Sequence, residues 1–359
     1  MRAQADGWER EASGGAPRNP GNPSRAEADL SDLPDLPDLA ALAQRLSHLE
    51  GLRGKRDIQA PARHFAHHPF PELGAAAALG DDAALVPAAP GPLLLACEGL
   101  HPQLVDEDPW FAGWSAVLVN LNDIAAMGGR PLALVNSLWS QGPEPAQALL
   151  EGMAFACHKF GVPMVGGHTN LQSPYSALSV AVLGTAPGPV LSARLARPGQ
   201  LCCLLAHHDG AFHRHYPFWD AATQADPGRL RAHLELLVQL AGAGVAKAAK
   251  DVSMGGIAGT AVMLAEAAGC RLELDLDAIE PPAGVALEAW LTCFPSYGYL
   301  LAVEASAVAD LAAAVAPHPG LWCGPIGRLV NGPASVELIQ AGDRSTLWPG
   351  DAPLTGFGP

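Results

Sequence analysis

The chain has 359 residues, of which 49 % are hydrophobic and 16 % are charged. It is therefore long enough for two domains with buried cores, and its composition excludes a wholly disordered protein. The formal net charge is −15 at pH 7. Because nucleic acids and anionic membrane surfaces are bound by basic protein surfaces, this charge disfavours both as partners.

Cysteine usage and the absence of long apolar runs indicate a compartment. The seven cysteines are scattered, with no C-x-x-C pair, which indicates reduced thiols. The start of the chain lacks the apolar core of a signal peptide. No stretch reaches the roughly 18 consecutive apolar residues of a membrane helix. We therefore expect a cytoplasmic protein.

The first predicted elements follow a polar beginning. Residues 1–37 are rich in Gly, Pro and charge, which predicts a disordered tail. A helix is expected over 38–50, because apolar residues recur there at helical spacing and Asp38 can cap its start. From about residue 52 the pattern alternates between strands and helices.

The pattern over residues 93–186 predicts strands that alternate with helices. Short apolar runs indicate strands at 93–98, 131–139, 162–167 and 176–186. Helices are expected at 109–127, where Asp108 is the cap and two glycines are the stop, and at 143–161.

A Pro- and Gly-rich segment at 186–200 predicts a domain boundary. Beyond it, strands are expected at 200–206, 270–276, 297–304 and 321–329, and helices at 228–250, after 256, near 284–292 and at 305–316. The pattern predicts an α/β (α+β) fold. Its expected parts are an N-terminal domain at 38–187, a C-terminal αβ domain at 188–335 and an extension at 336–359.

Acidic residues stand at several element ends. Asp81 and Asp82 follow Gly80 and precede an apolar run, and Mg²⁺ prefers such carboxylate oxygens. Solvated acids in a Gly-Asp turn are the alternative. Glu98 ends a predicted buried strand, the place where ligands bind in αβ sheets, although it is also compatible with an ordinary surface acid.

Asp123 lies within an otherwise apolar helical segment, close to Asn120. Aspartate is a poor residue in the middle of a helix, and its burial without a partner is costly. A bound metal is one compensation, and a hydrogen bond to nearby backbone or to Arg130 is the other. The segment is therefore a candidate metal or ligand site.

Two glycine-containing turns are candidate ligand sites as well. Gly166 and Gly167 precede His168, which is a candidate ligand, acid–base group or polar cap. Asp251 precedes the Gly255-Gly256 pair at a predicted helix start, where backbone N–H groups can bind phosphate. Neither a P-loop nor a G-x-G-x-x-G turn between strand and helix is present, so the common nucleotide-binding folds are not supported.

Four histidines at 207, 208, 213 and 215 suggest zinc only weakly. Their spacing fits no closed tetrahedral set with nearby cysteines, and the segment 207–220 is expected to be an exposed loop. No G-x-S-x-G or H-E-x-x-H motif is present, so serine hydrolases and zincins also lose support.

Taken together, the order of these motifs resembles one superfamily. It contains AIR synthase, thiamine-monophosphate kinase, selenophosphate synthetase and a hydrogenase maturation enzyme. The resemblance covers about residues 50 to 330 and is greatest to the AIR-synthase-related subfamily of unassigned substrate. It is carried by GDDAALV (80–86), EGLH (98–101), the segment 105–134, GGHT (166–169) and DVSMGGIAG (251–259).

The resemblance implies a fold, a cofactor and a set of site residues. Members are homodimers whose N-terminal sheets pair into a barrel, with ATP at the interface and Mg²⁺ held by acids. The matching metal positions here are Asp81, Asp82, Glu98, Asp123 and Asp251. The matching ATP-binding positions are Lys55, Asn120, Asp123, Gly166, Gly167, Asp251, Gly255 and Gly256, and Lys55 and His168 are the implied catalytic residues.

Departures from the family motifs disfavour each named activity. No cysteine precedes Cys97, Met254 stands where the kinase has a second aspartate, and His168 replaces a glutamate of AIR synthase. The chain also lacks the cysteine tail of the maturation enzyme. We therefore expect a Mg²⁺- and ATP-dependent enzyme that phosphorylates or activates a small molecule. The alternatives are a thiamine-monophosphate kinase and a non-catalytic nucleotide-binding or scaffold subunit.

Overall fold

The computed structural model describes residues 92–351 and 354–355. The predicted tail, the predicted helix at 38–50, Lys55, Asp81 and Asp82 lie outside the described residues. Within the described part, no helix is long and apolar enough to cross a membrane.

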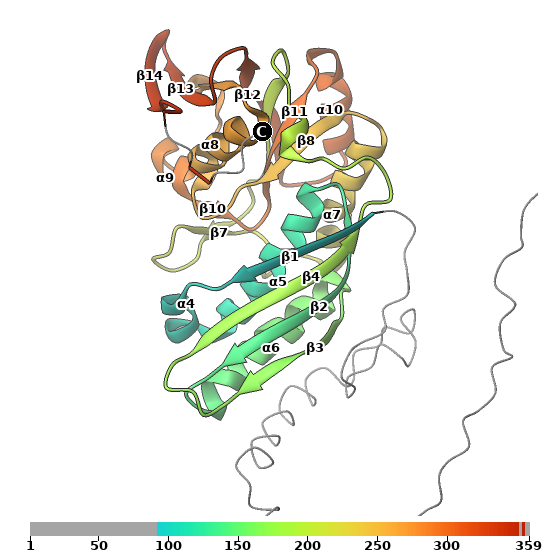
Figure 1. Ribbon diagram of the computed structural model, residues 1–359, viewed down its shortest axis with the longest axis vertical. Coiled ribbons are helices and arrows are strands. Elements are labelled where there is room, and N and C mark those ends of the chain that lie inside the picture. The colour runs from blue at the N-terminus through green and yellow to red at the C-terminus, as the bar shows by residue number, and fades with distance from the viewer. Residues whose placement is uncertain (1–91, 352–353, 356–359) are drawn as a thin grey trace, which may run out of the picture. The chain divides into compact units, whose positions relative to one another are not determined.

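The N-terminal layer is a four-stranded sheet covered by helices on one face (Figure 1). Its strand order is β1-β4-β2-β3, and only β2 and β3 run parallel. The strands are β1 (Leu93–Gly99), β2 (Arg130–Trp139), β3 (Met164–Asn170) and β4 (Ala177–Thr185). The helices are α4 (Pro102–Glu107), α5 (Pro109–Ala126) and α6 (Pro143–Phe160).

Local sequence explains where these helices begin and end. The Asp108 carboxylate accepts a hydrogen bond from the Phe111 N–H, and Pro109 occupies the first turn of α5, as the sequence predicts. Gly161 ends α6 in the left-handed conformation. No described helix covers the opposite face of the sheet, which carries exposed apolar side chains including Leu93 and Leu95.

The C-terminal part is built on a seven-stranded sheet of order β14-β13-β9-β12-β5-β11-β8. Its strands are β5 (Leu201–His207), β8 (Ala246–Asp251), β9 (Arg271–Asp275), β11 (Gly298–Val303), β12 (Leu321–Val330), β13 (Ser335–Gln340) and β14 (Asp343–Trp348). A small second sheet contains β6 (Ala211–Phe212), β7 (Phe218–Asp220) and β10 (Phe294–Pro295). The helices are α7 (Pro227–Gly242), α8 (Gly256–Ala268), α9 (Leu287–Thr292) and α10 (Val308–Val315).

Both faces of the central strands are buried, which accounts for the continuous apolar run of β5. Cys203 and Leu205 join a core with α7, α10 and the N-terminal helices. Cys202 and Leu204, on the other face, pack with α8 and Trp290. The first core is continuous across both domains, so their helices and strands pack as one body.

The prediction of one long helix over 228–250 is wrong. Helix α7 ends at Gly242, Gly244 turns the chain with a φ of +67°, and Ala246–Asp251 forms strand β8 against β11. Alanines suit a helix locally, but the free edge of β11 supplies backbone partners that override this preference. The segment expected as an extension after 335 adds β13 and β14 to the same sheet.

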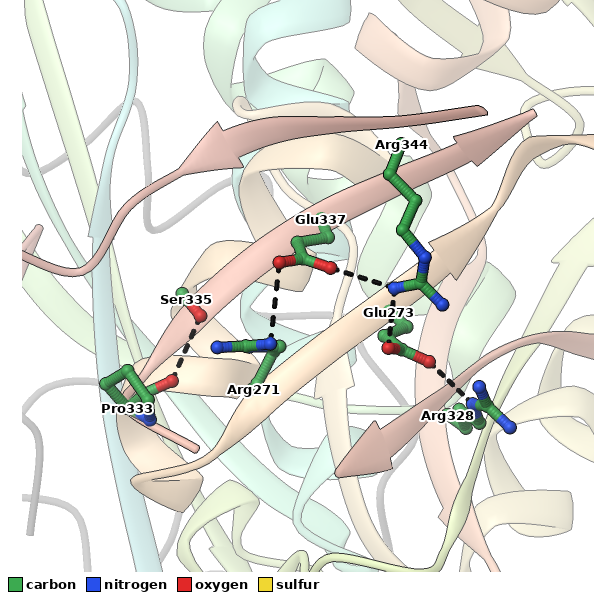
Figure 2. A network of polar contacts seen from close by, with 7 residues as sticks. All are labelled: Arg271, Glu273, Arg328, Pro333, Ser335, Glu337 and Arg344. Carbon is green, nitrogen blue, oxygen red and sulfur yellow. Dashed lines mark hydrogen bonds and ion pairs between the residues drawn. The ribbon is translucent and has the colours of Figure 1, made fainter. Parts of the chain in front are cut away.

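A network of charged side chains joins these last strands to the rest of the sheet (Figure 2). Arg344 lies between two carboxylates, 2.7 Å from Glu273 and 2.9 Å from Glu337. Arg328 approaches the other oxygen of Glu273 at 2.6 Å, and Arg271 lies 3.5 Å from Glu337. We call these five residues the arginine network. The hydrogen bonds from Arg344 and Arg328 outweigh burial and lower the pKa of Glu273.

Candidate active site

A cavity of about 600 Å³ lies between the N-terminal helices and the C-terminal sheet. Its walls come from the end of β1, from α4 and α5, from the small sheet and from the end of β8. The cavity therefore needs both domains. Its lining residues are Glu98–Pro102, Leu104, Phe111, Trp114, Ser115, Leu118, Val119, Asn122, Asp123, Phe218–Asp220, Lys250, Asp251, Ser253, Met254, Met263 and Phe294–Ser296.

Three of the predicted acids line this cavity. Glu98 comes from β1, Asp123 from the last turns of α5, and Asp251 from the end of β8. We call these three residues the carboxylate cluster. The Oδ2 atom of Asp123 is buried and has no hydrogen-bond partner among the described residues. An orphaned carboxylate oxygen among other acids is the arrangement that a bound cation would compensate.

The pKa values of the carboxylate cluster are raised. Burial, followed by the charges of Asp251 and Glu98, raises the pKa of Asp123 to about 8. Burial also raises the pKa of Asp251, and partial burial together with the Asp251 charge raises that of Glu98. The raised pKa values mean that the described surroundings of these acids disfavour their ionised forms, and a cation bound among them would favour ionisation.

Lys250 is a cavity residue that sequence reasoning missed. Its Nζ lies 3.8 Å from Oδ1 of Asp251, and it is the one lysine or arginine among the described residues that line the cavity. Its charge opposes the rise in the pKa of all three acids. A single ammonium does not neutralise three carboxylates. Within the described residues, no group of three or more acids, histidines or cysteines is arranged so that it could hold a metal ion by itself.

Asn122 joins helix α5 to the C-terminal sheet. Its side-chain amide donates a hydrogen bond of 3.0 Å to the Ser296 carbonyl and accepts one of 2.9 Å from the Tyr299 hydroxyl. Asn120, the asparagine predicted as a ligand contact, donates instead to the Ala116 carbonyl of its own helix and lies outside the cavity lining. Asn122 therefore fixes the position of the neighbouring Asp123.

The residues predicted around 166–168 lie away from this cavity. Strand β3 is at the opposite edge of the sheet from β1, and the exposed His168 ring lies 5.9 Å from that of Trp139. A Cβ atom on Gly167 would stand 2.5 Å from the Asn136 carbonyl oxygen, so packing requires this glycine. These positions belong to the sheet, not to the cavity.

Gly255 and Gly256 form the start of helix α8, directly after the cavity residues Ser253 and Met254. Gly256 has a φ of +63°, and a Cβ atom there would lie 2.4 Å from the Leu291 carbonyl oxygen. The structure gives this glycine a packing role as well. Lys55, Asp81 and Asp82 are not among the described residues.

The segment 207–220 forms one wall of the cavity, so the expectation of an exposed loop is wrong in part. His213 stacks on Phe111 at 3.6 Å between ring centroids and approaches the Asp108 carboxylate at 2.8 Å. The Trp219 indole donates to the His207 carbonyl at 2.9 Å. These contacts fix the wall against the start of α5.

His207 belongs to a histidine cluster with the buried His233 and the half-buried His318. Its ring centroid lies 5.4 Å from that of His233, which is 5.5 Å from that of His318. Burial, followed by nearby positive charge, lowers the pKa of His207 to about 4 and that of His233 to about 3. Both rings are therefore neutral at neutral pH.

Comparison with known proteins identifies the family. Family models for AIR synthase related protein match residues 80–186 (N-terminal domain) and 202–339 (C-terminal domain). An uncharacterised protein of Synechocystis sp. is 44 % identical over 305 residues, which cover 84 % of this chain and 94 % of that relative.

Two further proteins share more distant similarity. Phosphoribosylformylglycinamidine synthase subunit PurL of Rhodopseudomonas palustris is 27 % identical, with the match covering 75 % of this chain and 39 % of that subunit. The crystal structure of hydrogenase maturation protein HypE in complex with ATP superimposes with a TM-score of 0.63 at 19 % identity, covering 82 % of this chain and 94 % of HypE. This likeness shows a shared fold. The chain belongs to the AIR synthase related family.

Proposed function

We propose that the protein is an ATP- and Mg²⁺-dependent enzyme that phosphorylates or activates a small molecule. One observation carries the proposal: inside a cavity of about 600 Å³, the carboxylate cluster holds a buried oxygen of Asp123 that no described residue partners. Uncompensated carboxylates in a cavity favour a divalent cation, and polyphosphates bind proteins through such ions. The ATP complex of HypE, which shares the fold, adds support.

The donor chemistry of the site fits magnesium. Glu98, Asp123 and Asp251 offer the hard oxygen atoms that Mg²⁺ prefers. Asp81 and Asp82, with phosphate oxygens, are the further ligands that we propose for a complete shell. The bound ion supplies positive charge that offsets the charge of the transferred phosphoryl group.

The chain itself supplies position and a partly dry environment. Asn122 fixes Asp123 relative to the C-terminal sheet. Phe218 and Trp219, from the segment 207–220, and Phe111 of α5 give the cavity an aromatic lining. Phosphoryl transfer depends mainly on positioning and on electrostatic stabilisation. We assign Lys55 to a phosphate contact, on the resemblance of its motif.

The open face of the N-terminal sheet supports a homodimer. Leu95 is 78 % exposed and Leu93 62 % exposed, an unusual density of apolar surface on one strand. We propose that two copies pair these faces, which brings His168 to the interface. Light scattering tests this: Leu95→Asp is expected to give monomers, and Leu195→Asp, which alters an exposed leucine elsewhere, is expected to leave the dimer intact.

The decisive test of the activity is calorimetric titration of the purified protein with ATP, with and without MgCl₂. We expect binding that requires Mg²⁺, followed by ATP consumption when a metabolite panel contains the acceptor. Absence of ATP and ADP binding in the presence of Mg²⁺ would refute the proposal. Binding without consumption across a broad panel would favour a scaffold role.

A thiamine-monophosphate kinase remains the second enzymatic candidate. The Met254 side chain lines the cavity and is 56 % exposed, at the position where the kinase motif carries an aspartate. A thioether cannot replace a carboxylate as a ligand for Mg²⁺. We therefore expect no turnover of thiamine monophosphate in a coupled assay.

A further inference from the structure

We propose that Lys250 is the resident counter-ion of the carboxylate cluster, and that a divalent ion displaces it there so that its ammonium group binds the phosphates of the nucleotide. This inference rests on the proposed function. It adds a lysine from the C-terminal domain to a site for which the sequence motifs indicate Lys55 alone.

The position of Lys250 supports the first half of the proposal. It lies beside Asp251 at the end of β8, where both residues line the cavity. Among the described lining residues, no other lysine or arginine faces the cluster. Its electrostatic effect reaches Glu98 and Asp123 as well as its neighbour. Lys250 therefore supplies the positive charge that partly offsets three acids.

The contact between Lys250 and Asp251 is loose enough to exchange. The 3.8 Å separation is an ion pair but exceeds hydrogen-bond distance. The Lys250 side chain remains 29 % exposed, and lysine carries its charge on a flexible stem with rotatable donors. This pairing differs from the arginine network, where planar guanidinium groups are held at hydrogen-bond distance.

Displacement follows from charge. A divalent ion bound to Asp251 repels the ammonium group and takes over its role as counter-ion. Lys250 then remains in the same cavity without its carboxylate partner. Phosphate oxygens are strong acceptors for a lysine ammonium, and their charge attracts it. The lysine thus opposes metal binding when no nucleotide is present and favours binding of the metal–nucleotide pair.

The test uses Mn²⁺ alone and ATP with Mn²⁺ as probes, titrated by calorimetry into the full-length protein. Lys250→Met keeps the apolar stem and removes the charge. We expect it to bind Mn²⁺ alone roughly threefold or more tightly than the wild type, and ATP with Mn²⁺ roughly tenfold more weakly. Lys250→Arg keeps the positive charge and should therefore show affinities for both probes close to those of the wild type. Lys247→Met, on an exposed position of the same strand, is the matched control and should change neither.

The outcomes of these titrations distinguish failure of the Lys250 inference from failure of the proposed function. If Lys250→Met leaves Mn²⁺ affinity unchanged or lowers it, Lys250 does not compete with the metal and the inference falls. Unchanged affinity for ATP with Mn²⁺ overturns the phosphate contact. If the wild type binds neither probe, the proposed function fails and this inference fails with it. Far-UV circular dichroism of each variant identifies loss of fold, and if Lys250→Met is unfolded, Lys250→Gln takes its place with the same expected shifts.

Discussion

The molecule holds two groups of partly buried carboxylates. They differ in how many positively charged side chains lie beside them. In the arginine network, two glutamates face three arginines at distances of 2.6 to 3.5 Å. In the carboxylate cluster, three acids face Lys250 alone among the described residues that line the cavity. The pKa of Glu273 is lowered in the first group, and the pKa of Asp123 is raised to about 8 in the second.

This difference separates a structural role from a binding role. The network brings its own counter-charges and joins β9, β12, β13 and β14 in one sheet. The cluster lies in a cavity where, among the described lining residues, Lys250 is the one lysine or arginine, and we propose that a bound cation supplies further counter-charge. Strongly perturbed carboxylates in a cleft are candidate functional groups for this reason.

The largest effect is expected from a substitution that removes one acid of the carboxylate cluster. Asp123→Asn preserves the size of the side chain and removes its charge. We expect the Mg²⁺-dependent affinity for ATP to fall by about 10- to 100-fold. Calorimetry with and without MgCl₂ measures this, and Asp310→Asn, on an exposed position of α10, is the control. Wild-type affinity in Asp123→Asn would remove Asp123 from the metal site.

The two groups should also respond to pH in opposite directions. Because its folded-state pKa is raised, protonated Asp123 stabilises the protein fully at low pH, and this stability is lost as pH rises through about 8. Without ligands, Asp123→Asn should therefore gain stability over the wild type progressively between about pH 4 and 8. Thermal unfolding in metal-free buffers across this range tests it. A constant difference between the two proteins would contradict the raised pKa.

A smaller effect is expected when the network is broken. Glu273→Gln removes the acceptor charge shared by Arg328 and Arg344, and should lower the unfolding temperature by a few degrees at pH 7. The pKa of Glu273 is lowered in the folded state, so this deficit should diminish as the pH falls below the ordinary pKa of a glutamate and through the lowered one. ATP affinity should not change. Weakened ATP binding would show that the network also serves the cavity.

The smallest effect concerns an outer member of the network. The Arg344 side chain is 48 % exposed, and exposed ion pairs contribute little because solvent screens them. Arg344→Met should lower the unfolding temperature by about 1 °C or less. The deficit should shrink further in 1 M NaCl, because salt screens the charges. A larger loss than that of Glu273→Gln would identify Arg344 as the main contributor to the network.

Much of this architecture is predictable from the sequence, because long periodic segments fix element type. Helices α5 and α6 and the buried strand β5 follow directly from their apolar spacing, caps and glycines. Strand β8 is not predictable in this way. Its alanines favour a helix, and only the partner strand β11 makes an extended backbone the better solution.

The candidate site is predictable to a lesser extent. The motifs single out Glu98, Asp123 and Asp251, and the structure brings all three to one cavity. They do not indicate whether Asn120 or Asn122 contacts the other domain. The two side chains point in different directions because they are two residues apart on a helix, and the packing of the domains determines which one makes the contact. Lys250 is missed because two of the three acids around it come from distant segments, Glu98 from β1 and Asp123 from α5.

The distribution of the carboxylate cluster over β1, α5 and β8 has a consequence for biosynthesis. A nascent chain that has completed only its first sheet and helices presents Glu98 and Asp123 but not Asp251. The protein therefore has no complete set of acids until β8 has emerged and paired with β11, which itself comes later in the chain. For the metal site proposed above, the full set of acids would thus form only late in synthesis, and a truncated product would carry an incomplete set.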